Sequence, residues 1–123
     1  LKFYNAMKSG QREITVWGTG EASREFLYAE DCAQAIHDAV KAGNIGPEPM
    51  NIGTGEEVSI KELAEEIKEV CNFKGKLKFN SNLPDGNPRK LLDSTKMNNL
   101  GWSHKISLKD GLKSTYEWYI KNI

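Results

Sequence analysis

Short β-like runs limit the folds that this chain can adopt. The runs over residues 14–17, 25–28, 49–52 and 76–80 each span four or five residues, and Gly-Thr-Gly turns close the first and the third. Strands so few and so brief do not form a full doubly wound sheet. Together with the helical patterns between and after them, they predict a small mixed α/β fold of about four helices and several short strands.

The helix expected over residues 59–71 has the clearest pattern. Ser59 and Glu62 have the spacing of a capping box, in which each side chain bonds to the other residue's backbone N–H. The apolar residues of this helix recur at three- and four-residue steps and form one face. They are Ile60, Leu63, Ala64, Ile67, Val70 and Cys71. Similar but weaker patterns predict helices over residues 94–100 and 107–120.

A fourth helix is expected over residues 30–42. Glu30 and Asp31 lie in its first turn, where negative charge is favourable to the helix dipole, and Gly43 is placed to end it. Its apolar residues again recur at helical spacing, so we expect them to face the core. They are Cys32, Ala33, Ile36, Ala39 and Val40.

The chain begins with Leu1 rather than with methionine. Leu1, Tyr4 and Met7 have the spacing of an amphipathic helix, so we expect residues 1–9 to be the tail of a preceding helix. The chain length and these features predict one domain over residues 1–123, cut from a longer protein.

The charge balance argues against two classes of partner. Lys+Arg and Asp+Glu are equal at 17 each, whereas nucleic-acid-binding proteins usually carry a basic excess. The same balance argues against docking on an anionic membrane. No apolar run is long enough to span a bilayer and no signal peptide begins the chain, so we expect a cytoplasmic protein. Cys32 and Cys71 have no metal-ligand spacing and are interpreted as buried, reduced thiols, and no metal is expected.

The segment 84–93 carries two adjacent cations on a restrained loop. Pro84 and Pro88 fix φ, Gly86 permits a tight turn, and Arg89 and Lys90 supply positive charge. A loop that is ordered before it meets a phosphate binds at a lower entropic cost. The alternative is a solvated turn with two ordinary surface charges.

The stretch 16–27 could also carry chemistry. Trp17 ends a β-like run beside a glycine turn, and Arg24 follows that turn. An indole can line a nucleotide or sugar, and a guanidinium can hold a diphosphate with paired hydrogen bonds. Taken alone, the stretch fits a core tryptophan and a surface arginine better.

Two further motifs are interpreted as structural. The run 51–55, Asn-Ile-Gly-Thr-Gly, resembles the start of a dinucleotide fingerprint, but Val58 replaces its third glycine, so a plain turn is favoured. Tyr4 and Lys8 fit Tyr-x-x-x-Lys, yet no cofactor-binding βαβ unit precedes them. Tyr4 is therefore expected to be a packing residue.

These motifs occur together and in one order. The stretch 16–27 and the run 51–55 are followed by Pro-Asp-Gly-Asn-Pro-Arg-Lys-Leu-Leu-Asp over 84–93, by Leu-Gly-Trp over 100–102, and by a closing Gly-Leu…Thr-Tyr-Glu-Trp over 111–118. In this combination the chain resembles the C-terminal, substrate-binding part of the GDP-L-fucose synthase family. That family belongs to the extended short-chain dehydrogenase/reductases, among the NAD-dependent epimerases and dehydratases.

The resemblance implies an activity for the full-length enzyme. Such an enzyme epimerises carbons 3 and 5 of GDP-4-keto-6-deoxy-D-mannose and reduces the 4-keto group with NADPH. The NADP site and all catalytic residues would lie in an N-terminal Rossmann half that is absent here, so the fragment itself would be inactive. The resemblance further implies a homodimeric enzyme that pairs through the Rossmann half, and a monomeric fragment.

The resemblance also assigns site residues. Trp17 would line the substrate pocket, Arg24 would hold the diphosphate, and Lys90 would contact the phosphate or ribose side of the nucleotide. Lys76 stands where the family tends to have a substrate-contacting arginine. Asp85 and Arg89 would support the loop.

Two alternatives stay open. One is the substrate domain of a UDP- or dTDP-sugar epimerase or dehydratase, and the other is a non-catalytic interaction domain with no small-molecule site.

Overall fold

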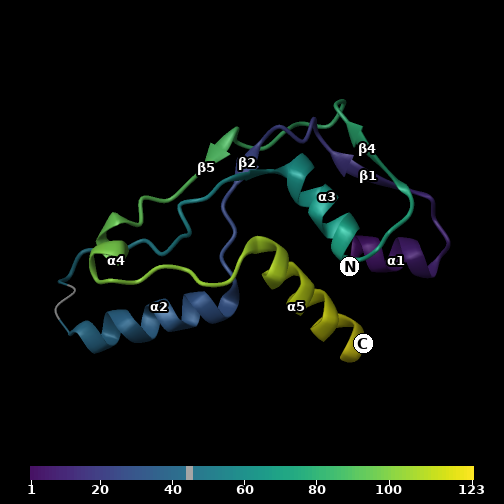
Figure 1. Ribbon diagram of the computed structural model, residues 1–123. Helices are drawn as coiled ribbons and strands as arrows, with labels where there is room; N and C mark the ends of the chain where they lie inside the picture. The colour runs from purple at the N-terminus through teal and green to yellow at the C-terminus, as the bar shows by residue number, and fades with distance from the viewer. Residues whose placement is uncertain (44–45) are drawn as a thin grey trace.

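The computed structural model describes residues 1–43 and 46–123. The helices are α1 (Lys2–Lys8), α2 (Ala29–Ala42), α3 (Ile60–Val70), α4 (Thr95–Asn99) and α5 (Leu108–Lys121). The strands are β1 (Glu13–Trp17), β2 (Ser23–Arg24), β3 (Val58–Ser59), β4 (Lys76–Asn80) and β5 (Arg89–Lys90). The predicted small α/β fold, with an N-terminal helix followed by four others, is confirmed for this part of the chain (Figure 1). None of the helices in this part of the chain combines the length and the hydrophobicity of a membrane-spanning segment.

The strands form two small sheets. β1 and β4 pair in parallel over five positions, from Glu13 opposite Lys76 to Trp17 opposite Asn80. The second sheet has the order β3-β2-β5, in which β2 is antiparallel to β3 and parallel to β5. Each strand of this second sheet is only two residues long.

Two of the four strand predictions are wrong. The predicted strand over 25–28 is displaced, because β2 ends at Arg24, and residues 49–52 form no strand. The apolar side chains that suggested them, Leu27, Met50 and Ile52, are partly buried against a core cluster. They are therefore buried by packing alone, without backbone pairing to a neighbouring strand.

Two apolar clusters form the core of the described residues. The first lies beneath β1 and β4 and contains Phe3, Ala6, Ile14, Cys71 and Phe73, with the Phe3 and Phe73 rings edge to face at 5.7 Å. The second joins α2 to α4 and the chain after it, through Ala35, Ala39, Met97 and Trp102. In Figure 1 the strands β2 and β5 lie between these two groups of elements.

The capping box of α3 and the glycine that ends α2 formed as the sequence predicted. Ser59 Oγ accepts from Glu62 N at 3.1 Å, and Glu62 Oε2 accepts from Ser59 N at 2.8 Å, which completes the capping box of α3. Gly43 ends α2 in the left-handed conformation, with φ of 67°. Ser107 caps α5 by accepting from Asp110 N at 3.1 Å.

The predicted inward face of α2 is wrong by about one position. Asp31, Ala35 and Ala39 are buried, whereas Ile36 is 54% exposed and Val40 is 71% exposed. The buried Asp31 carboxylate accepts from the backbone N–H groups of residues 105 and 106, at 3.1 and 2.9 Å. Because a buried carboxylate needs such donors, these bonds turn the Asp31 side of the helix inward.

The two cysteines differ in burial. Both are free thiols, and Cys71 is buried while Cys32 is only half-buried. Burial raises the pKa of the Cys71 thiol above its ordinary value. The prediction of two buried thiols is thus confirmed for Cys71 and wrong for Cys32.

Candidate functional site

Arg24 and Lys90 are register partners in the second sheet. Arg24 lies opposite Lys90 in the parallel pairing of β2 with β5, and Ser23 lies opposite Arg89. Successive side chains of a strand point to opposite faces, so Arg24 and Lys90 share one face of the sheet. Two cations from segments far apart in the sequence therefore lie side by side.

Arg89 belongs to the other face and is neutralised there. Its Nε donates to both Glu57 oxygens at 2.9 and 2.8 Å, and its Nη2 lies 2.6 Å from Glu57 Oε2. Ser23 Oγ donates to the same carboxylate at 2.7 Å. The bonds from Arg89 and then Ser23 hold the pKa of Glu57 below its usual value, and the carboxylate raises the pKa of Arg89. Arg89 therefore supports the loop through Glu57.

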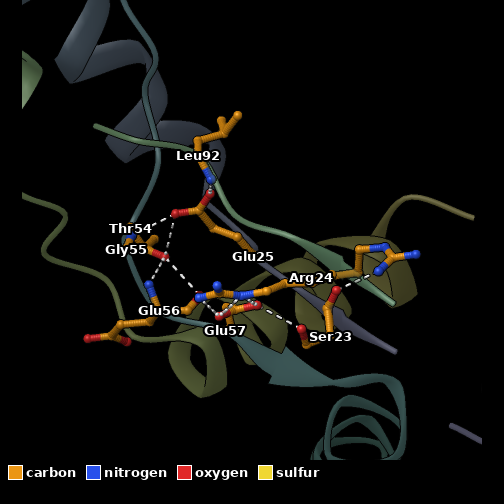
Figure 2. A network of polar contacts seen from close by, with 9 residues as sticks. Ser23, Arg24, Glu25, Thr54, Gly55, Glu56, Glu57 and Leu92 are labelled. Carbon is orange, nitrogen blue, oxygen red and sulfur yellow. Dashed lines mark hydrogen bonds and ion pairs between the residues drawn. The ribbon is translucent and has the colours of Figure 1, made fainter. Parts of the chain in front are cut away.

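Unlike Arg89, Arg24 and Lys90 are not neutralised by any carboxylate that the structure describes. Within residues 1–43 and 46–123, neither forms an ion pair with a carboxylate. Figure 2 shows the Arg24 guanidinium directed away from the carboxylates of Glu25 and Glu57. Its positive charge thus stays available to an anionic ligand.

Asp85 ties the basic segment to the turn after β1. Its Oδ1 accepts from Thr19 N at 2.8 Å and its Oδ2 accepts from Thr19 Oγ1 at 2.7 Å. These bonds hold the pKa of Asp85 below its ordinary value. A Cβ at Gly18 would lie only 2.0 Å from Asp85 Oδ1, so this close approach requires glycine. The segment is further held where Ser23 N donates to Pro88 O at 2.8 Å.

Trp17 stands at the end of β1, next to the turn that Asp85 holds. Its side chain is 68% exposed, whereas Trp102 is 6% exposed and lies in the core. The interpretation of Trp17 as a core tryptophan is therefore wrong. A large exposed indole beside an ordered turn is available for contact with a planar or sugar ligand.

Lys76 lies apart from these residues. It begins β4 opposite Glu13, four register positions from the Trp17–Asn80 pair, a separation of about 13 Å at the rise of a parallel strand. It lines a surface hollow together with Gly10, Arg12 and Lys74. The structure does not bring Lys76 to the sheet face that carries Arg24 and Lys90.

The turn at 51–55 does not fit a dinucleotide diphosphate. Gly55 N already donates to the Glu25 carboxylate at 2.6 Å, and the following helix is closed by its own capping box. A carboxylate thus occupies the position in which a phosphate-binding turn would hold its anion. Tyr4 packs edge to face on Tyr119, with ring centroids 5.4 Å apart, as expected for a packing residue.

Two site-supporting residues escaped prediction from the sequence. Glu25 and Glu57 bind partners about 30 to 67 positions away along the chain, so no local pattern marks them. The one available signal is that Glu25 directly follows Arg24 within the stretch 16–27. In the described part of the chain, no cluster of three or more His, Cys, Asp or Glu residues is arranged to hold a metal ion.

Comparisons with known proteins show which family and which enzymes the chain resembles. Residues 1–53 match the model of the NAD dependent epimerase/dehydratase family. The chain is 50% identical over 122 residues to GDP-L-fucose synthase 1 of Arabidopsis thaliana, covering 99% of this chain and 38% of that protein. It is 43% identical over 129 residues to GDP-L-fucose synthase of Escherichia coli K12, covering 98% of this chain and 40% of that protein.

A solved structure shares the fold. A GDP-L-fucose synthetase from Naegleria fowleri, solved with NADP bound, aligns with a TM-score of 0.87 at 28% identity, over 98% of this chain and 38% of that one. The chain spans about two fifths of the length of the curated relatives that it matches. By sequence and by fold, the chain is similar to members of the NAD dependent epimerase/dehydratase family.

Proposed function

We propose that this chain is the GDP-sugar-binding part of a GDP-L-fucose synthase. The observation that carries the proposal is the pairing of Arg24 with Lys90 on one face of a sheet that side-chain carboxylates hold together. The relatives named above are GDP-L-fucose synthases along nearly the whole chain. The full-length enzyme would convert GDP-4-keto-6-deoxy-D-mannose to GDP-L-fucose by epimerisation and NADPH-dependent reduction.

In this proposal the two cations bind the diphosphate. The Arg24 guanidinium offers a planar fork of N–H donors and the Lys90 ammonium offers a point charge, a combination suited to adjacent phosphates. Each charge-assisted contact contributes about 1.5–3 kcal/mol. Because Asp85 and Arg89 already hold the segment in place, little further ordering is needed when the ligand binds. Trp17 would line the sugar or base.

The chain would bind and orient substrate rather than perform chemistry. We expect no catalytic residue in it, and we expect NADP to bind the remainder of the full-length enzyme, as NADP is bound in the Naegleria fowleri structure. When bound, NADPH supplies the hydride for the reduction. A homodimeric enzyme, a cytoplasmic location and a single domain over residues 1–123 remain predictions.

Kinetics of the full-length protein test the proposal. We expect Arg24→Ala and Lys90→Ala each to raise KM for the GDP-sugar about 10- to 100-fold with kcat little changed, since both remove binding contacts. Lys113→Ala is the matched control, because it removes an exposed cation of α5 that belongs to neither sheet. Unchanged KM in both site variants would overturn the proposal and favour an interaction domain.

Nucleotide choice separates the proposal from its closest alternative. Titrating the full-length protein with GDP, UDP and dTDP should give the tightest binding for GDP. Preference for UDP or dTDP would instead assign the chain to an epimerase or dehydratase of those sugars. The isolated chain should bind GDP only around millimolar, about 4 kcal/mol, because few contacts offset the cost of association.

A further inference from the structure

The Glu25 carboxylate joins three separate segments of the chain. Its Oε1 accepts from Gly55 N at 2.6 Å and lies 3.4 Å from Thr54 Oγ1, while its Oε2 accepts from Leu92 N at 3.2 Å. Figure 2 shows this carboxylate between the turn at Thr54 and Gly55 and the backbone at Leu92. One side chain thus connects the end of β2 to the segments that lie before β3 and after β5.

The turn at 53–55 is shaped to receive this carboxylate. A Cβ at Gly53 would lie 2.5 Å from Glu25 Oε1 and 2.6 Å from Oε2, so any other residue there would displace the carboxylate. Gly55, whose N–H makes the shortest of these contacts, has φ of 77°, a conformation that favours glycine. The two glycines of the Gly-Thr-Gly run thus admit a carboxylate rather than a phosphate.

The position of Glu25 relates it directly to the two cations. It follows Arg24 in the chain, and Leu92, which it binds, lies two residues beyond Lys90. β2 and β5 pair over only two positions, so the backbone ladder alone restrains their relative placement weakly. Beyond the end of this ladder, the Glu25–Leu92 bond continues the connection between the two strands.

We propose that Glu25 is a positioning residue that sets the placement of Lys90 relative to Arg24 by binding Gly55 and Leu92. This inference rests on the proposed function, because it assigns the pair to one ligand. Glu25 itself would touch no substrate. This role follows from the hydrogen bonds of its carboxylate, which connect the end of β2 to the turn at Gly55 and to the backbone at Leu92.

Amide signals of the full-length protein test the contact itself. In Glu25→Ala, the Gly55 and Leu92 N–H groups lose their acceptor, so both should shift upfield in ¹⁵N–¹H spectra and exchange faster with solvent. Glu21→Ala removes an exposed carboxylate four residues earlier and serves as the control. Unmoved Gly55 and Leu92 signals would overturn the inference.

Kinetics test the consequence for the ligand. We expect Glu25→Ala to raise KM for the GDP-sugar about 10-fold while kcat changes less than about threefold, because ground-state and transition-state binding weaken together. Glu25→Asp keeps the charge but is one methylene shorter, so it should resemble Glu25→Ala. Glu25→Gln keeps one acceptor oxygen, and should restore part of the affinity.

The outcomes separate this inference from the function beneath it. If Arg24→Ala raises KM and a folded Glu25→Ala does not, Glu25 has no positioning role and the proposed function stands. If neither Arg24→Ala nor Lys90→Ala changes KM, the proposed function fails first. If Glu25→Ala does not fold, Glu25→Gln is compared with the unaltered protein by the same two measurements. The inference would be overturned if folded Glu25→Gln kept the wild-type KM and its Leu92 and Gly55 signals did not move.

Discussion

The two sheets of this molecule are held together in different ways. β1 and β4 pair over five positions and cover an apolar cluster that includes Ile14 and Phe73. The β3-β2-β5 sheet has two residues per strand, and the carboxylates of Glu25 and Glu57 supply much of its cohesion. The first region depends on backbone pairing and buried surface, and the second on polar side chains.

The difference explains where the candidate site lies. A core packed at native density tolerates little change in its buried side chains. Side-chain tethers can place a loop accurately while leaving its outer face open to solvent. Arg24 and Lys90 accordingly lie on the β3-β2-β5 sheet. Trp17 lies at the end of β1, close to the Thr19–Asp85 contact that connects the two regions.

The largest expected effect is a loss of stability when a buried ring of the β1–β4 region is truncated. Phe73→Ala should destabilise the chain by about 3–5 kcal/mol, because it removes a buried ring and leaves a cavity. Phe73 is 4% exposed and its ring packs on Phe3. Urea denaturation measures the change, with Phe26→Ala, at 38% exposure, as the control. A loss below about 1 kcal/mol would contradict the assignment of stability to this cluster.

Low pH should loosen the β3-β2-β5 region before the β1–β4 region. The pKa values of Glu57 and Asp85 are lowered in the folded chain by their bonds to Arg89 and Thr19. A lowered folded-state pKa stabilises at pH values above the unfolded pKa, and this stabilisation disappears as pH falls through the folded pKa. Below about pH 4, the usual carboxyl range, the β3-β2-β5 region should therefore loosen first.

Amide exchange near pH 3 measures this loosening. The Thr19 and Ser23 amides, which bond to the basic segment, should lose protection before the amides of β4, such as Leu77. Simultaneous loss of protection in both regions would show that the tethers do not respond to pH independently of the packed core.

The smallest expected effect concerns the fit of Arg24 against the loop. A Cβ at Gly86 would lie 2.9 Å from Arg24 Nη2, so Gly86→Ala should shift the guanidinium and raise KM about threefold, with stability unchanged. The kinetics of the double variant are the control. In the Arg24→Ala background, Gly86→Ala should add nothing, and additive effects would show that it acts elsewhere.

Much of the fold was predictable because local patterns determine it. The Ser59–Glu62 capping box, Gly43 at the end of α2 and the β-like run that forms β4 depend on residues within a few positions of one another, and all three are present. The predicted strands at 25–28 and 49–52 failed because apolar runs can be buried by packing alone. The predicted inward face of α2 was wrong because the hydrogen-bond donors to Asp31 lie more than 70 positions away in the chain.

The candidate site likewise has features that the sequence predicts and features that it does not. The residue types were available from the sequence: an arginine after a glycine turn, two cations on a proline-stiffened loop, and a tryptophan that ends a strand. The sequence by itself therefore determined the helices, the strands β1 and β4, and which side chains could meet an anion. Only the tertiary structure decided that Arg24 is paired with Lys90, that Glu57 neutralises Arg89, and that Lys76 lies apart. The physical reason is that these outcomes depend on parallel register and on carboxylates reaching across dozens of residues, which no local periodicity encodes.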